Sequence, residues 1–128
     1  MHTARALELH LLPHAFTIHR FLPDADIPAG LLSRPPWFIA RTEDELSIVC
    51  PSGISLESDQ AEPGWACFKV CGSLDFGEIG ILARLSSVLA HEQISIFAVS
   101  TYDTDYFLVR TVEAECAKRA LVAAGYTF

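Results

Sequence analysis

The stretch that decides the fold is ISIFAVSTYDTDYFLV, residues 94–109. Its first half carries branched and aromatic side chains and predicts a strand over Ile94–Thr101. The polar residues at positions 102–104 are typical of a turn. Asp105–Arg110 is a second apolar run of strand length. Two such runs joined by a short turn predict a β-hairpin.

A strand and a helix precede this hairpin, and a second helix follows it. Trp65–Cys71 predicts a strand, and Glu78–His91 predicts a helix because its apolar residues recur every three or four positions. Glu113–Ala123 predicts the second helix, which Gly125 ends. Tyr126–Phe128 can add a last short strand. The order βαββαβ is the split ferredoxin-like pattern, an α+β fold with an antiparallel sheet and both helices on one face.

The first sixty residues predict short strands and little helix. Ala6–Leu12 and Phe16–Leu22 are expected to be two strands, because Pro13 lies between them. A short helix is expected to end near Leu32. The remaining expectations are a hairpin of Trp37–Arg41 and Leu46–Cys50, with an acidic turn at Glu43–Glu45, and a polar connector over Pro51–Pro63.

The two halves of the chain are similar in pattern. Arg41–Val49 lies sixty residues before Thr101–Val109, and both stretches pass from an acidic tight turn into a strand that ends in aliphatic residues. We therefore expect an internal repeat of two modules. Residues 1–62 are expected to be a degenerate module with a shortened helix and an extra N-terminal strand, and residues 63–128 the complete one.

Charge and composition exclude several classes of protein. The net charge is −7 with only nine Lys and Arg, which argues against binding nucleic acid or anionic lipid. No apolar run approaches the roughly 20 residues of a membrane helix, and Met1–Leu12 does not have the pattern of a signal peptide. We therefore expect a soluble cytoplasmic protein whose four cysteines are reduced.

No set of residues predicts catalysis or metal binding. His10, His14 and His19 are spaced four and five apart, but a proline interrupts the segment, so we expect no metal. The two serines at positions 86–87 lack a nucleophile elbow and a partner base. The sequence has no glycine-rich phosphate loop. We expect no catalytic residue, no cofactor and no enzyme activity.

Asp75–Leu85 and Ile94–Val109 together closely resemble the ACT domain family. The shared features are a Gly-containing turn, Gly-Ile-Leu at a helix start, and the hairpin pattern quoted above. Within the family the chain is similar to CASTOR-type arginine sensors, small bacterial tandem ACT proteins and the aspartate-kinase regulatory tail. The match is dense over residues 64–128 and looser over 6–60. The resemblance implies tandem regulatory modules, with the ligand at an interface between ACT units.

A free amino acid presents a carboxylate and an ammonium group, and the sequence offers candidates for both. Free N–H groups at a helix start suit a carboxylate, and Gly77 and Gly80 flank such a start. Glu78 and Asp105 are candidates for the ammonium group. The predicted site comprises Gly77, Glu78, Ile79, Gly80, Ile81, Ser100, Thr101, Thr104 and Asp105.

Each of these residues has a structural alternative. The glycines can shape a turn, Glu78 can favour the helix dipole, and the hairpin residues can serve the hairpin alone. We expect an amino-acid-binding sensor that acts by contact with a regulated protein partner. A homodimer is expected because open sheet edges need pairing. The alternative is a structural or interaction module that retains no ligand site.

Overall fold

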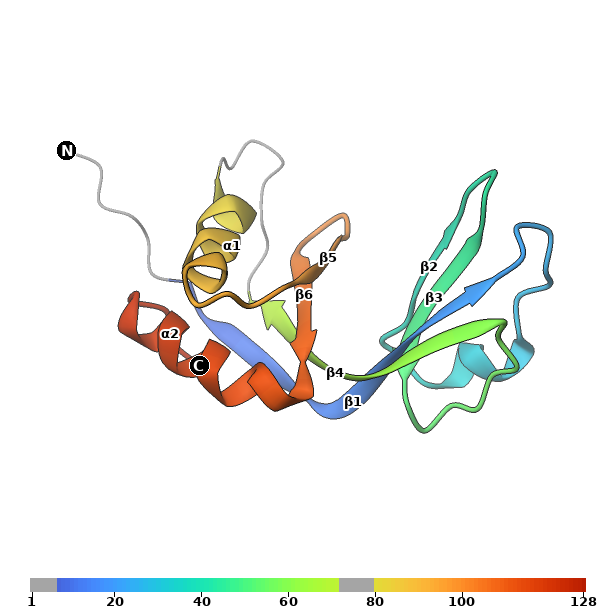
Figure 1. The fold of residues 1–128 in the computed structure, drawn as a ribbon, viewed down its shortest axis with the longest axis horizontal. Coiled ribbons are helices and arrows are strands. Elements are labelled where there is room, and N and C mark those ends of the chain that lie inside the picture. The colour runs from blue at the N-terminus through green and yellow to red at the C-terminus, as the bar shows by residue number, and fades with distance from the viewer. Residues whose placement is uncertain (1–6, 72–79) are drawn as a thin grey trace. The chain divides into compact units, whose positions relative to one another are not determined.

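The computed structural model describes residues 7–71 and 80–128, which form an α+β arrangement of antiparallel strands, two α-helices and two short 3-10 helices (Figure 1). The strands are β1 (Leu9–Phe21), β2 (Phe38–Arg41), β3 (Leu46–Pro51), β4 (Gln60–Val70), β5 (Phe97–Ser100) and β6 (Asp105–Arg110). The helices are η1 (Ala29–Ser33), α1 (Ile81–His91), η2 (Thr111–Glu113) and α2 (Ala114–Ala123). The chain divides into two compact units. The strand unit is His14–Trp65, and the helical unit takes the described residues up to Pro13 together with Ala66–Phe128.

Strand β1 is continuous, so the expectation of two strands separated by Pro13 was wrong. The reason lies in the direction of the proline nitrogen. The Leu9 N–H donates to the Thr127 carbonyl at 2.7 Å, on the side of β1 away from β4, and Pro13 turns its nitrogen to that same side. The register of β1 with β3 begins only at Phe16. The proline therefore lies where β1 pairs with no described strand on that side, and its missing N–H costs no hydrogen bond.

The strand unit has the strand order β2-β3-β1-β4. β3 is antiparallel to both of its neighbours, β1 and β2. At the turn between β2 and β3, the N–H groups of Asp44 and Glu45 both donate to Oγ1 of Thr42 at 3.2 Å. The Thr42 N–H donates to the Glu45 carbonyl at 2.8 Å. The hairpin with an acidic turn that the sequence predicted is therefore confirmed.

The apolar core of the strand unit lies on one face of its strands. It has a thin cover, which consists of the short helix η1 and the segment after β3. The core residues are Phe21, Leu31, Leu46, Ile48, Cys50 and Ile54. Thr17 and His19 lie on the same face of β1 as Phe21, since residues two apart in a strand share a face, and both are buried. Thr17 Oγ1 lies 2.7 Å from Ser52 Oγ, and His19 Nδ1 lies 2.8 Å from Ser58 Oγ. The short helix η1 and the segment after β3 therefore cover this core without an α-helix in the described part of the unit.

The helical unit has the strand order β1-β4-β6-β5. β5 and β6 pair antiparallel from Phe97↔Leu108 to Ser100↔Asp105, which confirms the hairpin predicted from residues 94–110. The C-terminal residues add only a single parallel bridge between Thr127 and Glu8. The two units therefore share one pattern. Each has an outer hairpin strand, then its hairpin partner, and then the long strands β1 and β4, which follow in opposite order in the two units.

Both α-helices cover one core in the helical unit, as the sequence predicted. Phe68 of β4 and Phe107 of β6 stack with ring centroids 4.9 Å apart and almost parallel planes. The buried residues packed with them are Leu7, Leu9, Ala66, Val70, Ile81, Leu85, Leu89, Ile94, Val109, Ala117 and Leu121. The predicted stripe of α1 is therefore present, although Leu82 and Val88 are only half-buried. No helix of the described residues is long and apolar enough to cross a membrane.

Candidate functional site: a hollow between the two helices

The hairpin residues predicted as ligand contacts are bonded to one another. Ser100 Oγ donates to Asp105 Oδ1 at 2.6 Å, across the last pair of the β5–β6 register. Thr101 Oγ1 and its N–H both donate to the Thr104 carbonyl, at 3.1 and 2.8 Å. Thr104 is buried, and its hydroxyl donates to the Val70 carbonyl at the end of β4. These bonds fix the hairpin turn and give each of the four residues a structural role.

The start of α1 carries backbone N–H donors that the helix itself does not use. Gly80 precedes the helix in the left-handed conformation, with φ of 82°, which glycine adopts without strain. The first helical bond runs from the Arg84 N–H to the Gly80 carbonyl at 2.9 Å. The N–H groups of the first three helical residues therefore have no partner within the helix, and the N-cap residue Gly80 has no side chain that could cap them. This end of α1 carries the positive end of the helix dipole.

The end of α2 presents the opposite charge. Gly125, with φ of 103°, closes the helix in a Schellman motif, as the sequence predicted. Its N–H donates to the Val122 carbonyl at 3.0 Å, and the Tyr126 N–H donates to the Leu121 carbonyl at 3.0 Å. The motif leaves the carbonyl groups of Ala123 and Ala124 as the last of the helix. They lie at the negative end of its dipole.

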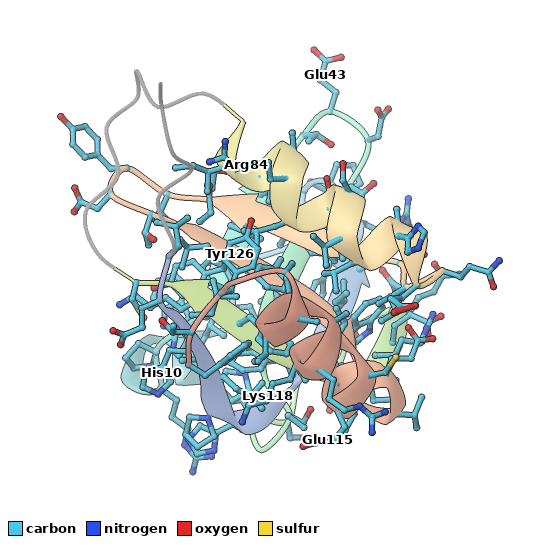
Figure 2. All side chains as sticks on the ribbon, turned by 90° about the vertical axis from the view of Figure 1, so that its left-hand side faces the viewer. His10, Glu43, Arg84, Glu115, Lys118 and Tyr126 are labelled. Carbon is cyan, nitrogen blue, oxygen red and sulfur yellow. The ribbon has the colours of Figure 1, made fainter. Side chains whose placement is uncertain are left out.

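A hollow of about 430 Å³ joins these two helix ends. Its wall on the α1 side includes Gly80 and Arg84, and its wall on the other side includes Ala124 and Tyr126. Figure 2 shows Arg84 on α1 and Tyr126 just after α2 at this end of the helices. The remaining described lining residues are Ala83, Ser87 and Val88. The described lining therefore combines the charged side chain of Arg84, two residues at and after the end of α2, and small or apolar side chains of α1.

The predicted site overlaps this hollow in part. Gly80 lines it, and Ile81 begins α1 beside it. Three predicted residues lie outside the described part of the chain: Gly77, Glu78 and Ile79. The hairpin residues are not among the described lining: Ser100, Thr101, Thr104 and Asp105.

Sequence reasoning did not find Arg84, Ser87, Ala124 or Tyr126. A signal for Arg84 was present, because it follows Gly80 by four residues and so lies on the same face of α1 as the helix start. No local signal pairs α1 with residues that follow α2, since that contact arises only in the folded unit.

Burial governs the chemistry of two of the four cysteines. All four cysteines lie in the described part and are free thiols. Burial raises the pKa of the Cys67 thiol to about 12 and also raises the pKa of Cys50, which suppresses the reactive thiolate form. Among the described residues, no group of three or more His, Cys, Asp or Glu side chains could hold a metal ion.

Comparison with known proteins identifies the class. The family model for the ACT domain matches residues 60–123, a range that includes β4 through α2. The chain therefore belongs to the ACT domain family. ACT domains are generally regulatory modules that bind small molecules. No curated protein matches the sequence.

Solved structures of related folds come from several bacteria. Protein Atu0741 from Agrobacterium tumefaciens is 38% identical, with a TM-score of 0.88, and the match covers 97% of this chain and 92% of that one. A protein of unknown function from Vibrio cholerae, VC0802, described as a possible transport protein, has 20% identity and a TM-score of 0.69, covering 92% and 89%. The ligand-free regulatory subunit of aspartate kinase from Thermus thermophilus has 12% identity and a TM-score of 0.67, covering 94% and 99%. The last two show similarity of fold alone.

Proposed function

We propose that this chain is a non-catalytic regulatory module that binds a free amino acid in the hollow between α1 and α2. The carrying observation is that one hollow is lined by both the N-terminal end of α1 and the C-terminal end of α2. Its volume of about 430 Å³ is within the range of small-molecule sites. A free amino acid carries a carboxylate and an ammonium group on the same carbon atom, so one compact ligand can meet both helix ends.

The chemistry of each end favours one group of the ligand. The free N–H groups at the start of α1 and the Arg84 guanidinium suit the carboxylate, because both donate charge-assisted hydrogen bonds. The backbone carbonyl of Ala124, which lines the hollow at the negative end of the α2 dipole, suits the ammonium group as an acceptor. The hydroxyl groups of Ser87 and Tyr126 can add neutral hydrogen bonds.

The repeated strand order supports a tandem organisation as part of the same proposal. In the strand unit η1 stands where the helical unit has α1, and the segment after β3 stands where it has α2. The strand unit then corresponds to the degenerate ACT module and the helical unit to the complete one.

The outer strands β2 and β5 have open edges in the strand order, which supports a homodimer. A regulated protein partner is proposed because the Thermus thermophilus structure of similar fold is a regulatory subunit.

Calorimetric titration of the chain with the free amino acids, including arginine and lysine, tests the proposal. At least one should bind saturably with millimolar or better affinity. Arg84→Gln should weaken that binding roughly ten- to a hundredfold, because a charge-assisted hydrogen bond is lost. Arg119→Gln is the matched control, since Arg119 is exposed on α2 and does not line the hollow. Equal affinities for the wild type and Arg84→Gln would contradict the proposed site.

The predicted role of Asp105 is tested by the same titration. If Asp105 contacts the ammonium group, Asp105→Ala weakens binding about ten- to hundredfold. Its bond to Ser100 favours the hairpin role instead, in which case the variant binds as the wild type does and loses a little stability. Absence of binding by every amino acid would leave the interaction module, without a ligand site, as the better account.

A further inference from the structure

A second hollow lies wholly within the strand unit and has different chemistry. It has a volume of about 620 Å³. Three segments supply its described lining: residues 14–15 of β1, residues 34–35 after η1, and residues 51–53 at and after the end of β3. None of these residues belongs to the helical unit. The hollow is therefore independent of the proposed amino-acid site.

Hydrogen bonds fix the turn after β3 that forms one wall. The Ser52 N–H donates to the Ala15 carbonyl at 2.9 Å, and the Ile54 N–H donates to the Pro51 carbonyl at 3.0 Å. The Ser52 hydroxyl is 2.7 Å from that of Thr17, whose side chain is buried. The turn is thus tied to the neighbouring strand by both backbone and side-chain bonds.

Arg34 lies against this turn. Its backbone N–H donates to the carbonyl of the fully buried Leu31 at 3.4 Å, which anchors the residue to the end of η1. A Cβ atom added at Gly53 would lie 3.2 Å from a terminal nitrogen of the Arg34 guanidinium. The glycine therefore leaves space for the guanidinium to approach the backbone of the turn.

The polar side chains of the hollow select for negative charge. Arg34 carries a permanent positive charge, and the imidazole of His14 adds a ring that can donate a hydrogen bond. Ser52 adds a hydroxyl group, and no carboxylate is present among the described lining residues. The chain as a whole carries a net charge of −7, so a described lining with an arginine and no carboxylate differs from the average composition of the chain.

We propose that this hollow of the strand unit binds the carboxylate or phosphate group of a small anionic molecule. The Arg34 guanidinium supplies a planar fork of donors that matches either group. His14 adds an imidazole to the lining, and the hollow is large enough for a small metabolite beyond its anionic group. The strand unit then has a binding role of its own.

The experiment titrates the full chain with inorganic phosphate and, separately, with succinate, at constant ionic strength, observed by amide NMR. The proposal expects saturable shifts of the amides around Ser52 and Gly53 with at least one probe. Saturation by phosphate alone identifies a phosphate ligand, and saturation by succinate alone identifies a carboxylate. Absence of saturable shifts with both probes would overturn the proposal.

Two matched pairs of variants assign the binding to this hollow. Arg34→Gln should weaken binding roughly ten- to a hundredfold, whereas Arg119→Gln should leave it unchanged. Gly53→Ala should weaken it by displacing the guanidinium, whereas Gly30→Ala, whose Cβ would meet nothing within 4 Å, should not. Equal losses in Arg34→Gln and Arg119→Gln would show non-specific attraction and overturn the proposal. Arg84→Gln should leave the affinity for the probes unchanged. The failure of this proposal can therefore be distinguished from the failure of the proposed amino-acid site.

Discussion

The two units of the chain share a strand order but cover their cores with different material. In the helical unit, α1 and α2 cover the sheet, and the core residues of β4 and β6, such as Phe68 and Phe107, are apolar. In the strand unit, a five-residue 3-10 helix and a loop provide the cover, and two buried residues on the core face of β1 are polar, Thr17 and His19. Buried polar groups need hydrogen-bond partners. Thr17 and His19 find theirs in two serines of the loop that covers the core.

The same difference separates the two hollows. Helix ends supply fixed backbone charges of both signs, so the hollow of the helical unit suits a ligand with both charges. The strand unit has no α-helix in its described part, and the charge in its hollow comes from the Arg34 side chain. If both proposals hold, the cover of each sheet decides which ligand chemistry its unit can offer.

The largest expected effect is on the core under the α-helices. Leu85 is fully buried in α1, so Leu85→Ala should lower the free energy of unfolding by about 3–4 kcal/mol through the cavity it leaves. Val122→Ala on the exposed side of α2 should change it by less than about 0.5 kcal/mol. Urea unfolding followed by circular dichroism measures both values. Equal small losses would show that the helical cover does not stabilise the unit as described.

A somewhat smaller loss is expected under the thin cover. Leu31 of η1 is also fully buried, and Leu31→Ala should cost about 2–3 kcal/mol, because a loop relaxes into a cavity more readily than a packed helix. The measurement is again urea unfolding. A loss below about 1 kcal/mol would break the comparison, since the strand unit would then not depend on η1 for its core.

The buried polar residue His19 should give a smaller effect that depends on pH. Burial lowers its pKa below the ordinary value of 6.5, because the charged ring loses hydration; its Nε2 is also buried without a partner among the described residues. The unfolded chain therefore binds a proton more readily than the folded chain. The contribution to stability is complete above pH 6.5 and is lost as the pH falls from there through the lowered pKa of the folded state.

His19→Gln keeps a polar group for Ser58 but cannot titrate. Its free energy of unfolding should fall less steeply between about pH 7 and pH 5 than that of the wild type. His10→Gln, at an exposed position, should retain the wild-type slope. Identical slopes for His19→Gln and the wild type would remove His19 as the cause.

Elements with local signals were predictable from the sequence. The hairpin of β5 and β6 follows from two strand-like runs around a polar turn, and the end of α2 follows from Gly125. The continuity of β1 through Pro13 was not predictable. It depends on which side of the strand has a neighbour, and that is a property of the assembled sheet.

The residues of the candidate site also divide into those with a local signal in the sequence and those that depend on the assembled fold. Gly80 was predicted because a helix start offers free N–H groups, a rule that operates along the chain. Ala124 and Tyr126 were not, because they reach the start of α1 only through the packing of two helices far apart in sequence. The hydroxyl and carboxylate groups of the hairpin were predicted as ligand contacts, but hydrogen bonding within the turn already uses Ser100 and Asp105.

The most direct test of the central claim is an amide NMR titration of the full chain with the amino acid that calorimetry shows to bind tightest. The hollow between the helices predicts saturable shifts for the amides of residues 81–83 at the start of α1 and 124–126 after α2. For an amino acid without a net negative charge, the amides of Ser52 and Gly53 in the strand unit should not move. Shifts confined to the hairpin at residues 100–105, or to the strand unit, would contradict an amino-acid site between the two helices.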